Sequence, residues 1–206
     1  MTIAYLYVLD TLADWEPSFL TAELNTGRMF RKRGTSVPVR TVGATHNQVT
    51  TLGGLRVTPD ITLAELSPSD AAVLILPGAD TWATQPAALT KAAEFLAAGV
   101  PVAAICGATV ALANTGLLDS RPHTSNDREL LAAVCPGYHG AAYYVEATVV
   151  TDGDLITATG TAPLDFARAV LARLDVVSAE ALEAWYQLHR TSDPRYFFEL
   201  RKAVAG

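Results

Sequence analysis

The feature that most constrains this chain is a short apolar stretch that passes into a helix through a cysteine. Residues 100–105 are apolar throughout, and Cys106, Gly107 and Ala108 connect them to a helical stretch without a loop. Such a turn, a nucleophile elbow, exposes its reactive side chain at the carboxyl end of a sheet, and small neighbours permit its tight backbone. The first amides of the helix favour a thiolate. We therefore expect Cys106 to be reactive and unusually acidic, although most free cysteines are buried and inert.

Two further apolar stretches have the character of buried strands. Residues 3–9 and 71–76 are continuously hydrophobic, which is typical of strands covered on both faces. Helices are predicted at 16–30 and at 87–98, the latter closed by Gly99. This alternation predicts an α/β fold in which a mostly parallel central sheet carries helices on both faces.

The second half of the chain adds a hairpin and three helices. Residues 145–151 and 155–159 flank a turn at Gly153, which predicts a hairpin at one edge of the sheet. Helices are predicted over 163–174, 178–188 and 194–203, with starts at Ser178 and Asp193 that suit helix caps. No repeat or linker interrupts the chain, so we expect one domain over residues 1–206, with additional helices at about 178–204.

Composition argues against several classes of partner. The 206 residues carry a formal net charge of -6, which repels nucleic acid and anionic lipid. The first apolar stretch ends at Asp10 and lacks a basic flank, so neither a membrane span nor a signal peptide is expected. With only two cysteines and no export signal, we expect a cytoplasmic protein without a disulfide. No metal-site spacing or phosphate-binding glycine loop is present, so no metal or cofactor is expected.

Two other strand ends should lie beside Cys106. Glu16 follows the first apolar strand at the start of a helix, and Gly78 follows the strand at 71–76. In an open α/β sheet the carboxyl ends of the strands border one crevice, where ligands bind. Backbone amides after Leu76 can approach the sulfur or a bound oxyanion there.

Together these segments resemble the PfpI/ThiJ superfamily over residues 3–174. That superfamily includes protease-like, glyoxalase- or deglycase-like and redox-sensing proteins and isocyanide hydratases, related in fold to class I glutamine amidotransferases. The resemblance implies a flavodoxin-like three-layer sandwich and a homodimer. It is carried by Trp15-Glu16, Leu76-Pro77-Gly78, Ala104-Ile105-Cys106-Gly107 and Asp152-Gly153-Asp154-Leu155-Ile156-Thr157, in that order.

The resemblance also implies roles for individual residues. Glu16 corresponds to the carboxylic acid that contacts the cysteine sulfur in protonated form, and the amides of Gly78 and Gly107 correspond to the oxyanion pocket. A carboxyl group beside a thiolate cannot ionise independently of it, so one of the two keeps a proton to high pH. Taken alone, Glu16 would be an ordinary acidic residue in a first helical turn.

The sequence departs from the superfamily where a histidine is expected. Gly107 stands where protease-like members have a histidine after the nucleophile, and Asn126 aligns with the histidine of glyoxalase-like members. An asparagine can orient a ligand but cannot act as a base. His123 and His139 are the remaining candidates for an accessory role, and either can equally be an ordinary structural histidine.

Two hypotheses follow for the function. In the first, the protein is a cysteine-dependent, amidotransferase-like hydrolase or lyase that acts on a small carbonyl, amide or isocyanide without a complete protease triad. In the second, it is a non-catalytic redox-sensing or stress protein whose Cys106 is oxidised to a sulfinic acid. The expected partners are a small-molecule substrate or oxidant and a second copy of the chain, because the Tyr143-Tyr144 pair suits an interface.

Overall fold

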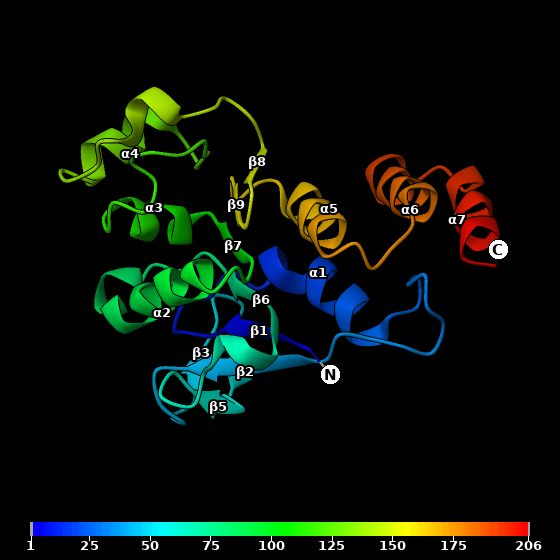
Figure 1. Cartoon of the computed structure of the whole chain (residues 1–206), viewed down its shortest axis with the longest axis horizontal. Helices are drawn as coiled ribbons and strands as arrows, with labels where there is room; N and C mark the ends of the chain where they lie inside the picture. Colours follow the sequence, from blue (N-terminus) through cyan, green and yellow to red (C-terminus); the bar gives the residue numbers. More distant parts are fainter. Residues whose placement is uncertain (1, 206) are drawn as a thin grey trace.

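A seven-stranded sheet lies between two layers of helices in the computed structural model, which describes residues 2–205 (Figure 1). This confirms the α/β, flavodoxin-like three-layer sandwich. The strands are β1 (Ile3–Tyr7), β2 (Val39–Gly43), β3 (Val49–Thr50), β4 (Arg56–Val57), β5 (Ile61–Thr62), β6 (Ala71–Leu76), β7 (Val102–Ile105), β8 (Val149–Asp152) and β9 (Leu155–Ala158). The helices are α1 (Trp15–Thr26), α2 (Pro86–Ala97), α3 (Gly107–Ala113), α4 (Arg128–Val134), α5 (Pro163–Leu174), α6 (Ala179–Thr191) and α7 (Arg195–Ala205).

The order of the strands brings four chain segments to one edge of the sheet. That order is β5-β2-β1-β6-β7-β9-β8, and every pairing is parallel except that of β8 with β9. The central strands β6 and β7 are buried, as expected of strands covered on both faces. Because β1, β6, β7 and β9 run in the same direction, the residues that follow them meet at the carboxyl edge of the sheet.

The helices divide between the two faces of the sheet. Figure 1 shows α2 and α3 on one side of the strands and α1 and α5 on the other, with α6 and α7 stacked beyond them. Trp185 of α6 is 1 % exposed and packs edge-on against Phe19 of α1, so α6 covers the outer side of α1. In contrast, α7 contains no buried residue.

The largest differences from the predicted bounds, four residues each, occur at the end of the first helix and at the start of the edge hairpin. The first helix ends at Thr26 rather than at residue 30, because Gly27 adopts the left-handed conformation (φ 57°) and its N–H bonds to the carbonyl of Glu23. The edge hairpin is present, but β8 begins at Val149. The preceding Val145 donates its N–H to the carbonyl of His123 and so does not pair with β9.

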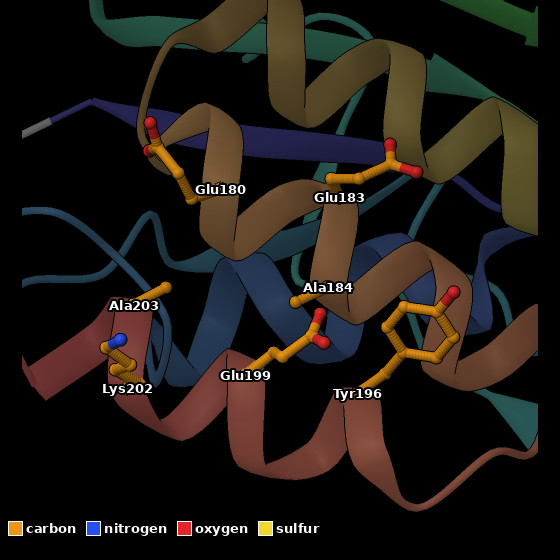
Figure 2. Close-up of a pocket in the computed structure, with 7 residues that line it drawn as sticks. All are labelled: Glu180, Glu183, Ala184, Tyr196, Glu199, Lys202 and Ala203. Carbon is orange, nitrogen blue, oxygen red and sulfur yellow. The ribbon is translucent and has the colours of Figure 1, made fainter.

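A groove of about 600 Å³ lies between α6 and α7 (Figure 2). Its lining shares no residue with the depression around Cys106 that is described below. The groove is lined by Glu180, Glu183, Ala184, Tyr196, Glu199, Lys202 and Ala203.

No helix between residues 2 and 205 combines the length and hydropathy of a membrane crossing.

Candidate active site

Cys106 lies on a strained turn between β7 and α3. Its backbone has φ 59° and ψ −124°, a conformation that is rare outside glycine and that functional sites retain. The surroundings hold it there, since its N–H donates to the carbonyl of Ala158 at the end of β9. A Cβ on Gly107 would lie 2.8 Å from the carbonyl oxygen of Ala79, so the turn needs glycine at that position. The geometry is that of a nucleophile elbow.

The ends of β1, β6 and β7 converge as the sequence predicts. Glu16 is the second residue of α1, and its Oε2 accepts the N–H of Gly78 at 2.5 Å. A Cβ on Gly78 would lie 2.8 Å from the Cβ of Cys106. These contacts bring Gly78 and Cys106 into one cluster with Glu16, although they follow it by 62 and 90 positions in the chain. The cluster forms because parallel strands place their carboxyl ends together.

The carboxyl group of Glu16 is completely buried and only half satisfied. Its Oε1 is buried and makes no hydrogen bond of ordinary geometry with any residue from 2 to 205. A Cβ on Gly160 would lie 2.7 Å from the Sγ of Cys106 and 3.1 Å from that same Oε1, so both atoms border one point. Burial raises the pKa of Glu16. The unpartnered oxygen beside the sulfur is therefore placed to hold a proton.

The thiol of Cys106 is not acidic in this setting, and that part of the sequence prediction is wrong. Burial raises its pKa, and the neighbouring Glu16 raises it further, while the amide of Asn126 and the N–H of Gly107 lower it. Burial and the carboxylate outweigh the donors at the start of α3, and the net shift is upward. Glu16 and Cys106 therefore compete for protons as a coupled pair.

Asn126 donates a hydrogen bond to the sulfur. Its Nδ2 lies 3.3 Å from the Sγ of Cys106, and its Oδ1 accepts the N–H of Gly160 at 2.8 Å. A backbone N–H can only donate, so this second bond fixes the oxygen toward Gly160 and the amino group toward sulfur. The amide at position 126 is thus held as a donor to negative charge on Cys106.

The two candidate histidines lie elsewhere. His123 is buried, and its ring nitrogens bond to the carbonyl of Arg121 (2.8 Å) and the hydroxyl of Tyr138 (2.6 Å). Burial lowers the pKa of His123, as expected of a structural histidine. His139 is exposed in the turn after α4. Neither residue lines the depression around Cys106, so the structure does not bring a histidine base to the sulfur there.

Of the two backbone amides predicted to form an oxyanion pocket, those of Gly78 and Gly107, the first is not available. The N–H of Gly78 is already bound to Glu16, so it is not free for an oxyanion. The N–H of Gly107 lowers the pKa of Cys106 and is therefore directed at the sulfur. The nitrogen of Ala79 lies 3.3 Å from the position of a Cβ on Gly107, and no residue from 2 to 205 accepts its N–H.

The side chain of Cys106 lines a surface depression of about 630 Å³. The sequence interpretation missed the wall formed after β9 by Thr159, Gly160 and Thr161, although the strand-end rule that located Glu16 applies equally to that segment. Among the described residues, no group of three or more His, Cys, Asp or Glu side chains is arranged to hold a metal ion. The lining consists of Trp15, Glu16, Cys106, Asn126, Thr159, Gly160, Thr161 and Pro163.

The chain is similar to a known protein family and to proteins of known structure. The profile of the DJ-1/PfpI family matches residues 2–173. The chain is 47% identical over 203 residues to the uncharacterized protease YoaZ of Bacillus subtilis, covering 97% of this chain and 96% of that protein. The crystal structure of a thiJ/pfpI family protein from Bacillus anthracis matches with a TM-score of 0.95 and 47% identity, over 98% and 96% of the two chains. A DJ-1 superfamily protein from Agrobacterium tumefaciens matches with a TM-score of 0.80 and 33% identity, over 93% and 99%.

Proposed function

The chain belongs to the DJ-1/PfpI family, and we propose that it is a cysteine-dependent hydrolase or lyase acting on a small carbonyl, amide or isocyanide. The observation that carries this proposal is the buried Oε1 of Glu16, which borders the Sγ of Cys106 and, among residues 2–205, has that thiol alone as a group with which to share a proton. A carboxyl group whose pKa is raised by burial holds a proton more readily than an exposed one and can return it to the substrate. Glu16 thereby supplies the proton transfers for which other cysteine enzymes use histidine.

The first step can be written for an aldehyde. The Sγ–H proton of Cys106 passes to Oε1 of Glu16, and the sulfur lone pair forms a bond to the carbonyl carbon. The carbonyl π pair moves to oxygen, which takes the proton from Glu16. The product is a hemithioacetal, and Glu16 returns to its carboxylate form. One carboxyl group serves first as base and then as acid, so the net change is addition of the thiol across C=O.

Donors around the sulfur support the charge that develops on oxygen. Three donors are candidates: the N–H of Gly107, the N–H of Ala79 and the amino group of Asn126. Each lies at or beside the elbow, and among the described residues none of them donates to an acceptor other than the sulfur. Preorganised donors of this kind contribute about 100- to 1,000-fold each when they bind the oxyanion.

Peptide hydrolysis is not part of the proposal, although the Bacillus subtilis relative carries the word protease in its name. Cleavage of a peptide bond requires a proton for a poor amine leaving group. Within the depression, Glu16 is the only titratable side chain besides Cys106, and it is completely buried.

The proposal is tested by comparing substrates. We expect Cys106-dependent consumption of a small carbonyl such as methylglyoxal and no hydrolysis of casein or fluorogenic peptides, because thiol addition needs less proton delivery than amine departure. Wild type and Cys106→Ser are assayed side by side, with Cys135→Ser as the control for general thiol chemistry. Peptide hydrolysis that disappears in Cys106→Ser would contradict the assignment, and so would methylglyoxal consumption that survives it.

A redox-sensing role is the second candidate, supported by the fixed donor of Asn126. A sulfinate needs hydrogen-bond donors for its two oxygens, and the Nδ2 of Asn126 already points at the sulfur. Oxidation would consume two peroxide molecules, each releasing water as one oxygen is added to sulfur.

Graded peroxide treatment checks this role. Mass spectrometry is expected to show Cys106 sulfinic acid before any oxidation of Cys135, which is 1 % exposed. Asn126→Ala is expected to carry Cys106 onward to sulfonic acid at lower peroxide, since the donor that holds the product is lost. Equal oxidation of the two cysteines in wild type would rule the sensor role out.

A further inference from the structure

The wall of the depression points to the kind of substrate that the proposed enzyme accepts. Trp15 is 54% exposed although it lies directly before the completely buried Glu16. A ligand that covers an exposed indole at the mouth of a cavity gains binding energy, because aromatic rings contribute much of that energy where they become buried. Trp15 is therefore a candidate surface for ligand contact.

Hydrogen bonds through a single residue, Gly160, connect the ring of Trp15 to the cluster around Cys106. The indole Nε1–H donates to the carbonyl of Gly160 at 3.4 Å. The backbone N–H of Gly160 donates to the side chain of Asn126, whose amino group donates to the sulfur of Cys106. Gly160 also packs against the sulfur, since a Cβ there would lie 2.7 Å from Sγ. The indole is thus anchored to the segment that touches the reacting atom.

The depression offers no cationic side chain to an anionic substrate. No Lys, Arg or His is among its lining residues, and Glu16 is the only ionisable group besides the cysteine. A carboxylate or phosphate placed near Cys106 would meet this buried acid with no cation to balance it. Thr159, Thr161 and Pro163 complete the wall with neutral hydroxyl and apolar groups.

We propose that Trp15 is a specificity-determining residue that selects uncharged substrates with a planar apolar group, which stacks on the indole while the electrophilic carbon reaches Cys106. The depression, at about 630 Å³, falls within the range of small-ligand sites. This inference rests on the proposed function for its substrate, but the recognition it describes is a binding property that can be measured without turnover.

Binding of two isosteric probes tests the inference. Cys106→Ser protein, which cannot form a thioester, is titrated with benzamide and benzoate by calorimetry. We expect benzamide to bind and benzoate to bind at least about tenfold more weakly, because only the second carries a charge toward Glu16. Trp15→Ala should weaken benzamide binding about three- to tenfold, the range expected for a lost aromatic pair, while Trp15→Phe should retain most of it.

The outcomes separate this inference from the proposed function. Benzoate binding as tight as that of benzamide, unchanged affinity in Trp15→Ala, or no benzamide binding would each overturn the inference. Failure of the proposed function shows itself independently, as absence of Cys106-dependent methylglyoxal consumption by wild type. Among active carbonyl substrates, phenylglyoxal should have the lower KM in wild type and lose that advantage in Trp15→Ala, whereas a selectivity that does not move would count against the inference.

Discussion

Replacing Glu16 by glutamine is expected to lower Cys106-dependent turnover about 100- to 10,000-fold, the contribution of a positioned acid–base group. Glutamine keeps the shape of the side chain and can still accept the N–H of Gly78 through its amide oxygen. It cannot take the thiol proton and pass it to the substrate. Steady-state kinetics with methylglyoxal provides the measurement.

The same substitution should raise thiol reactivity while it lowers turnover. Glu16 raises the pKa of Cys106, so its removal should lower that pKa and shift the pH profile of Cys106 alkylation to lower pH. At a given pH below the wild-type pKa, more thiolate is then present and alkylation is faster. The buried Cys135 serves as an internal control within each protein, because its surroundings do not change.

A matched variant separates this effect from simple loss of a buried glutamate. Glu23 lies on the same helix and is 2% exposed, but it bonds to Arg28 and Trp185 rather than to the elbow. Glu23→Gln should leave the alkylation profile of Cys106 in place. If Glu16→Gln retains turnover within about threefold of wild type, Glu16 is not the acid–base group and the proposed mechanism fails.

Replacing Gly160 by alanine is expected to reduce turnover about 100-fold, because misplacing reacting groups by about 1 Å has an effect of this size. The new Cβ would lie 2.7 Å from Sγ and 2.8 Å from the Cβ of Cys106, distances that force the cysteine or the segment to move. Gly160 is not among the glycines with positive φ, so the effect comes from the contact and not from the backbone.

Gly153→Ala is the matched control for Gly160→Ala. Gly153 has φ 57° in the turn between β8 and β9, and a Cβ there meets nothing within 4 Å. Its substitution should destabilise the fold by about 1–2 kcal/mol through backbone strain and leave turnover unaltered. Thermal unfolding and kinetics of both variants are compared. Equal activity in the two variants would show that the close approach of Gly160 to the sulfur has no part in the chemistry.

The parts of the fold that rest on local pattern could be predicted from the sequence. Continuous apolar runs identified β1, β6 and β7, since strands buried on both faces have no polar side to obscure them. The strand β2 was missed, because Arg40 and Thr41 interrupt its hydrophobic pattern and its first residues are only half-buried. Elements near the edge of the sheet depend on tertiary pairing, which one sequence does not display.

The candidate site likewise has features that the sequence predicts and features that depend on the folded structure. Cys106 and Glu16 lie beside each other, as predicted from the rule that the ends of parallel strands meet; their catalytic role stays a prediction. The contact of Asn126 with sulfur also agrees with its aligned position, but its orientation depends on Gly160, 34 residues further along the chain. The acidity of Cys106 was predicted with the wrong sign, because the amides of the elbow are visible in the sequence whereas the degree of burial is not.

The two C-terminal helices belong to the fold to different degrees, which bears on how the protein loses its structure. The family match ends at residue 173, yet α6 contributes the buried Trp185 to the packing beyond that point. Ser192, in the left-handed conformation, ends α6, and α7 follows with no buried residue and with Phe198 69% exposed. Segments with little buried apolar surface open at lower free energy than the rest of a domain. We therefore expect the cooperative unfolding unit to extend past the family match into α6, and α7 to open before the strands around the elbow.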